Sequence, residues 1–522
     1  MNSWDVVIVG AGPTGLVAAA LFEKIGLKVA LFDSETSGVN EPRAVHFDDE
    51  IMRIFHLAGV GLEVEEISRP IFGMQIKNIQ NDILMNFSRE GLGENGFSRA
   101  YSFDQPELEA ILRLHVRQCK NVSFYEGFKL VSIFDKSIEE AWNDSLNHSI
   151  GLNFEIKSEH KNGNEQILTK YLLACDGAKS FVRQHFEIAL TDFGMHDRWM
   201  VVDANVTEEL ELFNGVLQVC DELNPNTYVR TGALRHRWEF MLKSADIENE
   251  FLLESQIRKR LEFWIGLKSA QGAHIRRKAV YQFHALVAER FRKANVFLLG
   301  DAAHQTPPFI GQGMGAGIRD ALNIYWKIAF VLSEKSKSSI LDSFEIERKR
   351  HVTLTIKQAL LLGKIMKLKD WPLLKWTKLR NAILIIFNKI EFVKSILEKN
   401  TNPKLKGGNL IFGIHRLSGS LLPRFVLNIE GEGESLLDMW ALGGLNLIEK
   451  SCINDQGTVW PQKWGKCLKI KSEQSSHSIL WEWMKQNEIE AFVLRPDFVV
   501  LEAGKSRDVS RWVKRIAEFL DR

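Results

Sequence analysis

Asp5-Val-Val-Ile-Val-Gly10-Ala-Gly12-Pro-Thr-Gly15 is the stretch that decides the fold. Its apolar run, which ends in a glycine, predicts a buried strand. The Ala- and Leu-rich segment 16–25 predicts a helix that Gly26 ends, and segment 27–33 predicts a second strand. A strand, a glycine turn, a helix and a second strand in this order form the βαβ unit that begins a dinucleotide-binding domain.

The glycines of this turn explain how such a unit holds a dinucleotide. Gly10, Gly12 and Gly15 let the backbone turn tightly and approach a pyrophosphate, while the helix N-terminus supplies N–H groups and a partial positive charge. Asp33 ends the second strand, where its carboxylate can accept hydrogen bonds from a ribose diol. The same spacing recurs at Gly91-x-Gly93-x-x-Gly96, but no Ala/Leu-rich helix follows, so this copy predicts a loop.

Two later segments favour FAD as the dinucleotide. The first contains Asp176-Gly177, and the second begins at Gly300-Asp301, where the strand predicted for 296–300 ends. Asp301 is placed to bind a polyol such as the ribityl chain of a flavin. The turn Gly311–Met314 opens a predicted helix, and its N–H groups can stabilise the negative charge that a reduced flavin carries near its pyrimidine edge.

The composition excludes several classes of protein. A chain of 522 residues predicts about two to four domains. The formal net charge of +1 gives no global attraction to nucleic acid. The five cysteines include no C-x-x-C pair or Cys/His cluster, so neither a disulfide framework nor a metal site is expected, and a cytoplasmic location fits. The N-terminus lacks the pattern of a signal peptide, and no apolar run approaches the ~18–20 residues that span a bilayer.

Together the three motifs resemble those of the class A flavoprotein aromatic hydroxylases, which include para-hydroxybenzoate hydroxylase. Within this family the chain most resembles the 3-(3-hydroxyphenyl)propionate hydroxylase-like FAD-dependent monooxygenases. The likeness covers nearly the whole chain and is strongest in residues 1–60 and 171–350. The closer resemblance rests on segments 42–50, 199–203, 237–241, 341–348, 435–438 and 495–497.

The resemblance implies an α/β fold built from a Rossmann-like FAD-binding domain, an inserted and mainly antiparallel sheet domain, and a thioredoxin-like C-terminal domain. The expected FAD-binding domain is discontinuous and comprises residues 1–72, 98–185 and 281–362. The expected remaining parts are a substrate-binding sheet domain of residues 73–97 and 186–280, a helical region and linker of residues 363–434, and the C-terminal domain of residues 435–522. Neither Cys452 nor Cys467 forms a C-x-x-C pair, so packing or assembly is a better expectation for that domain than redox chemistry.

The resemblance also implies individual roles at the cofactor. Asp33 would hold the adenosine ribose, and Arg43 and Gln105 would face the pyrophosphate and the ribityl chain. Asp176 and Gly177 would serve both FAD and passing NAD(P)H. The remaining implied cofactor residues are Gly10, Gly12, Gly15, Gly300, Asp301, Pro308, Gly311, Gly313 and Met314, with Pro308 beside the ring where oxygen reacts.

Two positions depart from the pattern of these relatives. Gly315 stands where an Asn is common, so a side-chain contact to the flavin would be lost and the pocket would be roomier. His46 stands where many relatives have Gly. It is either a base near the flavin or a residue at the edge of a helix, and the sequence leaves both interpretations open.

The expected reaction follows from flavin chemistry. NAD(P)H reduces FAD, O2 adds to give a flavin C(4a)-hydroperoxide, and an electron-rich phenol attacks the distal oxygen. A phenol pKa near 10 makes an acceptor useful at neutral pH. The candidate residues that assist the substrate are His46, Tyr228, Arg235 and His236, where Arg235 could instead pair with a substrate carboxylate.

Alternatives remain at this point. The enzyme could act on a polycyclic or heteroaromatic substrate, insert oxygen next to a carbonyl, or be an FAD-dependent oxidoreductase that does not oxygenate. The choice between NADH and NADPH is open, because no site for a 2′-phosphate can be identified. The expected partners are a small aromatic substrate, O2 and NAD(P)H, with a homodimer as the one assembly considered.

The stretch 363–399 is basic and apolar at helical spacing. It predicts a helical pair with a solvated basic face, and the alternative is a surface that touches a membrane or an anionic partner.

Overall fold

The structure is a computed structural model. It describes residues 3–38, 43–134, 150–158, 161–221, 225–243, 246–367, 377–389, 404–405, 413, 415–429, 433–450, 460–470 and 477–521. Pro42, Lys369, Lys375, Lys394 and Cys452, which belong to segments discussed above, lie outside these residues.

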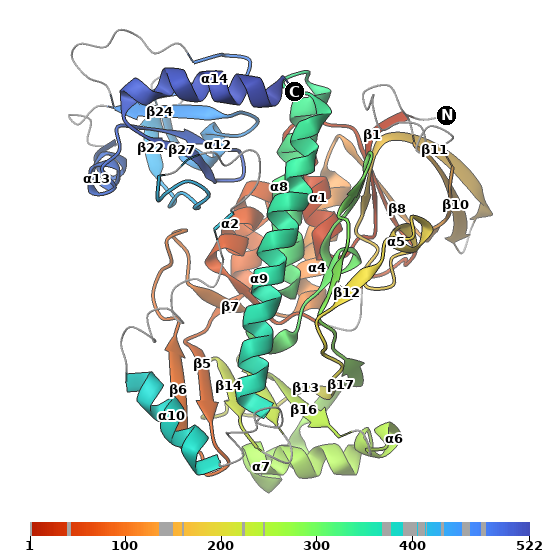
Figure 1. Ribbon diagram of the computed structural model, residues 1–522. Helices are drawn as coiled ribbons and strands as arrows, with labels where there is room; N and C mark the ends of the chain where they lie inside the picture. The colour runs from red at the N-terminus through yellow and green to blue at the C-terminus, as the bar shows by residue number, and fades with distance from the viewer. Residues whose placement is uncertain are drawn as a thin grey trace.

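The first sheet has eight strands, and its centre is parallel (Figure 1). Strand β1 (Ser3–Val9) pairs in parallel with β2 (Val29–Asp33) on one side and with β11 (Lys161–Ala174) on the other. The sheet continues through parallel β8 (Val122–Glu126) and β20 (Val296–Leu298), and through antiparallel β9 (Phe128–Phe134), β10 (Ile150–Ser158) and β19 (Arg292–Lys293). The buried apolar run Val6–Val9 forms β1, as its sequence predicts.

Helix α1 (Pro13–Lys24) follows β1 and contacts α2 (Asp49–Ala58), α4 (Gln105–Gln118) and α8 (Gly313–Leu332). Two glycines make this packing close. A Cβ on Gly15 would lie 2.0 Å from the carbonyl oxygen of Gly10, and one on Gly317 would lie 2.3 Å from Oγ1 of Thr14. Glycine at these positions therefore lets α1 begin against the Gly10 turn and lets α8 approach the start of α1.

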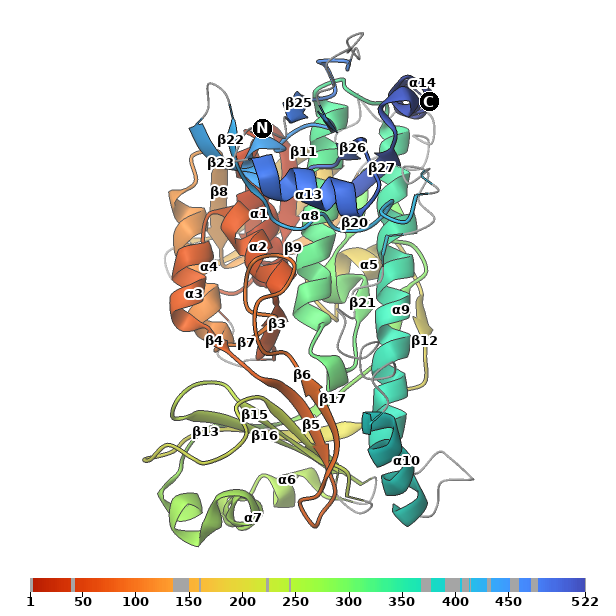
Figure 2. The same cartoon turned by 90° about the vertical axis from the view of Figure 1, so that its left-hand side faces the viewer.

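Smaller elements complete this part of the chain. They are β3 (His46–Asp48), α3 (Gly61–Ile67), β4 (Arg69–Pro70), β7 (Ala100–Ser102), α5 (Phe181–His185), β12 (Leu190–Asp192), β18 (Leu286–Ala288) and β21 (His304–Gln305). Gly91–Gly96 forms a loop, as predicted. The long helix α9 (Asp342–Lys367) packs on α8 and runs from the level of the C-terminal elements down to the second sheet (Figures 1 and 2).

The second sheet has seven strands in the order β17-β13-β16-β15-β14-β5-β6, and only the β14–β5 pairing is parallel. Helices α6 (Glu248–Phe251) and α7 (Glu254–Gly272) lie along the face away from the first sheet (Figure 2). Its strands are β5 (Gly73–Lys77), β6 (Ile83–Ser88), β13 (Arg198–Asn205), β14 (Val216–Val219), β15 (Asn226–Arg230), β16 (Arg235–Leu242) and β17 (His274–Gln282).

The C-terminal part has its own small sheet, in the order β25-β24-β26-β27. The first pairing is parallel and the other two are antiparallel. The elements of the whole C-terminal part are β22 (Val426–Ile429), β23 (Gly433–Leu436), α12 (Leu437–Trp440), β24 (Asn446–Lys450), β25 (Cys467–Ile470), α13 (Ser478–Gln486), β26 (Ala491–Leu494), β27 (Val500–Gly504) and α14 (Val509–Leu520).

A buried polar cluster joins this C-terminal part to the helices of the first layer. Arg495 donates to Glu347 of α9 over 2.8 and 2.9 Å and also pairs with Asp497. Lys327 of α8 lies 2.9 Å from the same Glu347 carboxylate. The side chains of Arg495, Glu347 and Lys327 are fully buried. Removing one member would therefore leave another charge without its partner away from water.

The sequence prediction of a mixed α/β fold is confirmed. From the basic stretch the structure describes the end of α9 and α10 (Thr377–Lys389), and α10 contacts β6. The backbone N–H of Asn86 donates to Oδ1 of Asn388 over 3.0 Å. Among the described residues, no helix is both long enough and apolar enough to cross a membrane.

Candidate functional site

A cavity of about 1400 Å³ lies between the two large sheets. Its wall includes the carboxyl ends of parallel strands, marked by Val9, Asp33, Cys175 and Leu299. Ligands of open α/β sheets bind in the crevice outside such strand ends. The opposite wall is the face of the seven-stranded sheet that points away from α7.

One end of the cavity has room for a phosphate group at the first glycine turn. Nothing lies within 4 Å of the position a Cβ would take on Gly12, and Gly12 borders the cavity. Gly10, in contrast, approaches the backbone so closely that a Cβ would lie 2.2 Å from the carbonyl oxygen of Cys175. The structure therefore gives the two glycines different tasks: Gly12 leaves space, and Gly10 allows close packing.

Asp33 lines this end of the cavity and is held from two sides. Its Oδ2 accepts the N–H of Ala11 over 3.1 Å and a hydrogen bond from Arg113 over 2.9 Å. Arg113 on α4 was not identified from the sequence. These contacts fix the carboxylate at the end of β2, where the sequence predicts that it meets a ribose.

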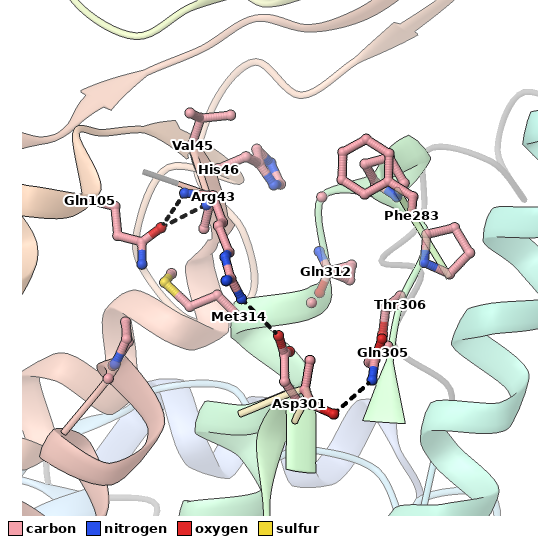
Figure 3. A pocket seen from close by; sticks show the side chains of 18 of the residues that line it. Arg43, Val45, His46, Gln105, Phe283, Asp301, Gln305, Thr306, Gln312 and Met314 are labelled. Carbon is pink, nitrogen blue, oxygen red and sulfur yellow. Dashed lines mark hydrogen bonds and ion pairs between the residues drawn. The ribbon is translucent and has the colours of Figure 1, made fainter. Parts of the chain in front are cut away.

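Arg43 and Asp301 face each other across the cavity, with Arg43 Nη1 3.7 Å from Asp301 Oδ2 (Figure 3). The loop that carries Arg43 is fixed by Gln105, whose Oε1 accepts the N–H groups of Arg43 and Ala44 over 2.7 and 2.8 Å. Gln105 lines the cavity too, but its amide oxygen is engaged by this loop. Its contribution in the structure is to position Arg43.

Asp320 on α8 holds the Gly300–Asp301 turn. Its Oδ2 accepts the N–H of Gly300 over 3.0 Å and lies 2.7 Å from Nε2 of His304, while Arg348 Nε donates to its Oδ1 over 2.7 Å. Burial disfavours the charge of Asp320, but His304 and Arg348 hold its pKa below the ordinary value. Sequence reasoning missed Asp320, although its position on the same helix as the glycine turn is a usable signal.

A second buried group holds the Gly311–Met314 turn at the start of α8. Arg319 pairs with Asp48 and Glu50, each over 2.7 Å, and donates to Oε1 of Gln312 over 3.0 Å. Burial opposes ionisation of Asp48, yet the Arg319 guanidinium holds its pKa below the ordinary value. The turn is thus fixed from behind, which leaves the helix N-terminus directed at the cavity.

The expectation of a roomier pocket at Gly315 finds no support in the structure. Gly315 is buried in α8 and is absent from the cavity lining. A Cβ there would lie 2.9 Å from Nη1 of Arg319 and 3.3 Å from Cγ1 of Ile51. The space that the missing side chain leaves is therefore occupied by Arg319.

Gly315→Ala is expected to lower the free energy of unfolding by about 1–3 kcal/mol, because overpacking forces the guanidinium off its partners. Thermal unfolding of the apoprotein measures this change. Gly272→Ala is the matched control, since a Cβ there meets only Oγ1 of Thr207 at 3.9 Å. Equal stability of Gly315→Ala and the unmodified chain would contradict the tight packing.

His46 lies at the start of β3 and points into the cavity, beside the turn at Gly311 (Figure 3). A Cβ on Gly311 would lie 3.0 Å from Nδ1 of His46. Burial lowers the pKa of the imidazole, and the nearby Arg89 and Arg319 lower it further, against the opposing effect of Asp48. This shift favours the neutral imidazole, in which one ring nitrogen can accept a hydrogen bond.

Tyr228 and His236 are not in the cavity, which corrects their selection as substrate contacts. Tyr228 Oη lies 2.8 Å from Nδ1 of His236, and both pack into the apolar layer under the sheet with Trp238. Successive side chains of a strand point to opposite faces, so neighbours of these residues face the cavity instead. Burial lowers the pKa of His236 to about 4.

Arg235 is also absent from the cavity lining. Its guanidinium forms ion pairs with two carboxylates, with Nη1 2.8 Å from Asp104 and 2.7 Å from Glu107. Arg235 therefore pairs with carboxylates of the protein and does not reach a substrate in the cavity. The side chains that do form this wall, and that sequence reasoning missed, include Val201, Gln218, Thr227, Arg237 and Glu239.

The remaining candidates surround the central part of the cavity. Pro308, Gly311, Gly313 and Met314 line it from one loop, and Asp176-Gly177 line it from another. Gly177 has φ +79° and open space at its Cβ position. Gly15 and Gly300 act behind the surface as close-packing residues. No group of His, Cys, Asp and Glu suited to a metal ion occurs in the described part of the chain.

The residues present fit an FAD molecule. The open space at Gly12 suits a pyrophosphate, the polar groups of Asp301 and Arg43 suit the hydroxyl groups of a ribityl chain, and the helix N-terminus at Gly313 suits an anionic ring edge. Apolar and polar side chains of the second sheet line the same cavity.

Comparisons with known proteins agree with this description. Residues 3–359 match a family model described as an FAD binding domain. The chain is 30% identical over 370 residues to a probable NADH-specific resorcinol 4-hydroxylase of Rhodococcus jostii, covering 71% of this chain and 67% of that protein. It is 25% identical to the 3-(3-hydroxy-phenyl)propionate/3-hydroxycinnamic acid hydroxylase of Escherichia coli, over 99% of this chain and 95% of that one. The crystal structure of aklavinone-11 hydroxylase with FAD and aklavinone has the same fold, with a TM-score of 0.78, 18% identity and full coverage of both chains.

Proposed function

Because the chain belongs to the class A flavoprotein aromatic hydroxylases, we propose that it is an FAD-dependent monooxygenase that hydroxylates a small phenolic ring with O2 and NAD(P)H. One observation carries the proposal. A single cavity joins the end at Asp33, the turn at Asp301 and the helix N-terminus at Gly313 to a space lined by the second sheet.

FAD, when bound, supplies the chemistry that takes a hydride from NAD(P)H and activates O2. The chain would hold it by Asp33 and Gly12 at the nucleotide end, by Arg43 and Asp301 at the ribityl chain, and by the N–H groups of Gly313 and Met314 at the ring edge. The two sheets would shield the reacting atoms from two sides, which would limit loss of the activated oxygen as peroxide. His46, as a neutral imidazole, is an acceptor in the same cavity and a candidate base for the phenol.

We propose NADH as the reductant to test first, because the relative from Rhodococcus jostii is named as NADH-specific. We also propose a cytoplasmic location, which the isolated cysteines support.

The proposed domain division follows the sheets. Residues 1–72, 98–185 and 281–362 would bind FAD, residues 73–97 and 186–280 would form the substrate-binding sheet domain, residues 363–434 would be a helical region and linker, and residues 435–522 would be thioredoxin-like. The strand order β25-β24-β26-β27, with its one parallel and two antiparallel pairings, supports the last assignment.

The test is consumption of NADH and O2 by the FAD-loaded protein, with resorcinol and 3-(3-hydroxyphenyl)propionate as the first phenols. The expected result is NADH oxidation that a phenol stimulates at least tenfold, with a product one oxygen heavier by mass spectrometry. Oxidation that no phenol accelerates, with peroxide as the only product, would favour an oxidoreductase that does not oxygenate. Failure to bind FAD would refute the proposal altogether.

A further inference from the structure

Four neighbouring strands present one row of side chains to the cavity. Val201 on β13 is opposite Glu239 on β16, Glu239 is opposite Thr227 on β15, and Thr227 is opposite Gln218 on β14. All four line the cavity. Since paired residues on adjacent strands lie side by side on one face, Glu239, Thr227 and Gln218 form a continuous polar row in an otherwise mainly apolar wall.

Glu239 is buried apart from the surface that it turns to the cavity, with its side chain 12% exposed. Among the side chains that the structure describes, its one ion pair is with Arg237 on the same strand, whose Nη1 lies 4.0 Å from Oε1. Arg237 is already held by Asp203 on β13 through hydrogen bonds of 2.7 and 2.9 Å, and it also donates to the carbonyl oxygen of Arg43 over 3.0 Å. Neutralising Arg237 therefore does not require Glu239.

A buried carboxylate is costly when its ion pair is as long as 4.0 Å and the cation is already neutralised by another carboxylate, so the presence of Glu239 requires another explanation. Burial raises the pKa of Glu239, and Asp203 raises it further, while Arg237 opposes this rise. The strand neighbours Val201 and Thr227 carry no charge. The Glu239 carboxylate can therefore accept a hydrogen bond from a donor that enters the cavity.

The other end of the row reaches the loop proposed to border the flavin ring. Gln218 Nε2 lies 3.5 Å from the carbonyl oxygen of Phe309, which follows Pro308. Its Oε1 is buried and makes no hydrogen bond with the described residues. Strands are about 4.8 Å apart, so Glu239 and Gln218 are separated by roughly 10 Å, enough for one aromatic ring and its substituents.

We propose that Glu239 accepts the hydrogen bond of the substrate hydroxyl group and takes its proton as the ring is hydroxylated. This inference rests on the proposed function. The substrate O–H bond breaks, an Oε–H bond forms on Glu239, and the electron pair stays on the ring oxygen, where it enriches the ring. Thr227 and Gln218 hold a second polar substituent. The preferred substrates are phenols that place a neutral hydroxyl group, and not a carboxylate, against Glu239.

The test uses FAD-loaded protein and compares Glu239→Gln with Glu239→Asp. The control is Glu209→Gln, which removes a carboxylate outside the cavity. Glu209 is exposed and pairs with Arg230. We expect Glu239→Gln to reduce kcat with resorcinol by at least 100-fold, as removal of a general base does, and Glu239→Asp to retain part of the activity. The acidic limb of kcat/KM, which lies above the ordinary range of a glutamate because burial raises the pKa of Glu239, disappears in Glu239→Gln and persists in Glu239→Asp.

A binding measurement separates this inference from the proposed function, because it needs no turnover. The absorbance of 4-nitrophenolate reports the ionisation of the bound phenol. The negative charge of an ionised Glu239 disfavours the phenolate form of the bound probe. We therefore expect the pKa of bound 4-nitrophenol to fall in Glu239→Gln and to stay unchanged in Glu209→Gln.

Wild-type kcat and an intact acidic limb in Glu239→Gln would overturn the proposal and assign the base to His46. Loss of FAD from that variant would also overturn it, because Glu239 would then serve the fold or the cofactor. An unmodified enzyme that shifts the probe but oxidises no NADH would refute the proposed function alone.

Discussion

Arg495→Met lowers the free energy of unfolding by about 3–5 kcal/mol, the cost of breaking a buried ion pair from one side. Arg495 is the only cation within 4.0 Å of Asp497 among the described side chains, and it shares Glu347 with Lys327. Without the guanidinium, carboxylates from α9 and from the C-terminal part remain buried. Urea denaturation, followed by intrinsic tryptophan fluorescence, measures the change.

Two controls show whether charge causes the loss. Lys505→Ala breaks the exposed pair with Glu490 and is expected to cost at most about 1 kcal/mol. The combined change Arg495→Met with Glu347→Gln and Asp497→Asn removes the stranded carboxylates and is expected to recover part of the stability. If this combination were no more stable than Arg495→Met alone, lost packing and not unpaired charge would explain the effect.

Gly12→Ala weakens FAD binding at least tenfold and leaves the Tm of the apoprotein nearly unchanged. The backbone of Gly12 has φ −74° and ψ 179°, which alanine adopts freely, and the space beside it is open. A methyl group there meets only a ligand that passes close to the turn. Flavin fluorescence during titration of the apoprotein with FAD measures the affinity.

Gly15→Ala is the matched comparison, since its methyl group meets the protein itself, 2.0 Å from the carbonyl oxygen of Gly10. The apoprotein of this variant is expected to unfold at a lower temperature. Equal FAD affinity in Gly12→Ala and in the unmodified chain would show that the pyrophosphate does not pass this turn.

The nucleotide end of the cavity was predictable because its residues are neighbours in the sequence. The βαβ unit at Gly10 fixes its own geometry through a tight turn and a helix start, and Asp33 follows at the end of the next strand. The turn at Gly300 is equally local. The structure accordingly places Asp33, Asp176 and Asp301 around one cavity.

The substrate wall was not predictable from residue types alone. Tyr228 and His236 carry suitable chemistry, but they share a face with Trp238 and pack under the sheet. Strand periodicity held a signal: Trp238, Phe240 and Leu242 alternate with Arg237, Glu239 and Met241, which identifies the apolar face. The supporting groups Asp320 and Arg319 were missed for another reason, because their partners Gly300, Asp48 and Glu50 come close only after α8 packs.

The alternation along β13, β14, β15 and β16 also bears on how this enzyme can diversify. The cavity is lined by residues 199, 201, 216, 218, 227, 229, 237 and 239. The apolar layer against α7 contains residues 200, 202, 217, 228, 238, 240 and 242. Selection, in nature or in a laboratory library, can therefore vary the first set and leave the second untouched. The residues that determine substrate specificity and the residues that stabilise the fold alternate along the same strands. Substitutions can therefore change the substrate without changing the hydrophobic core.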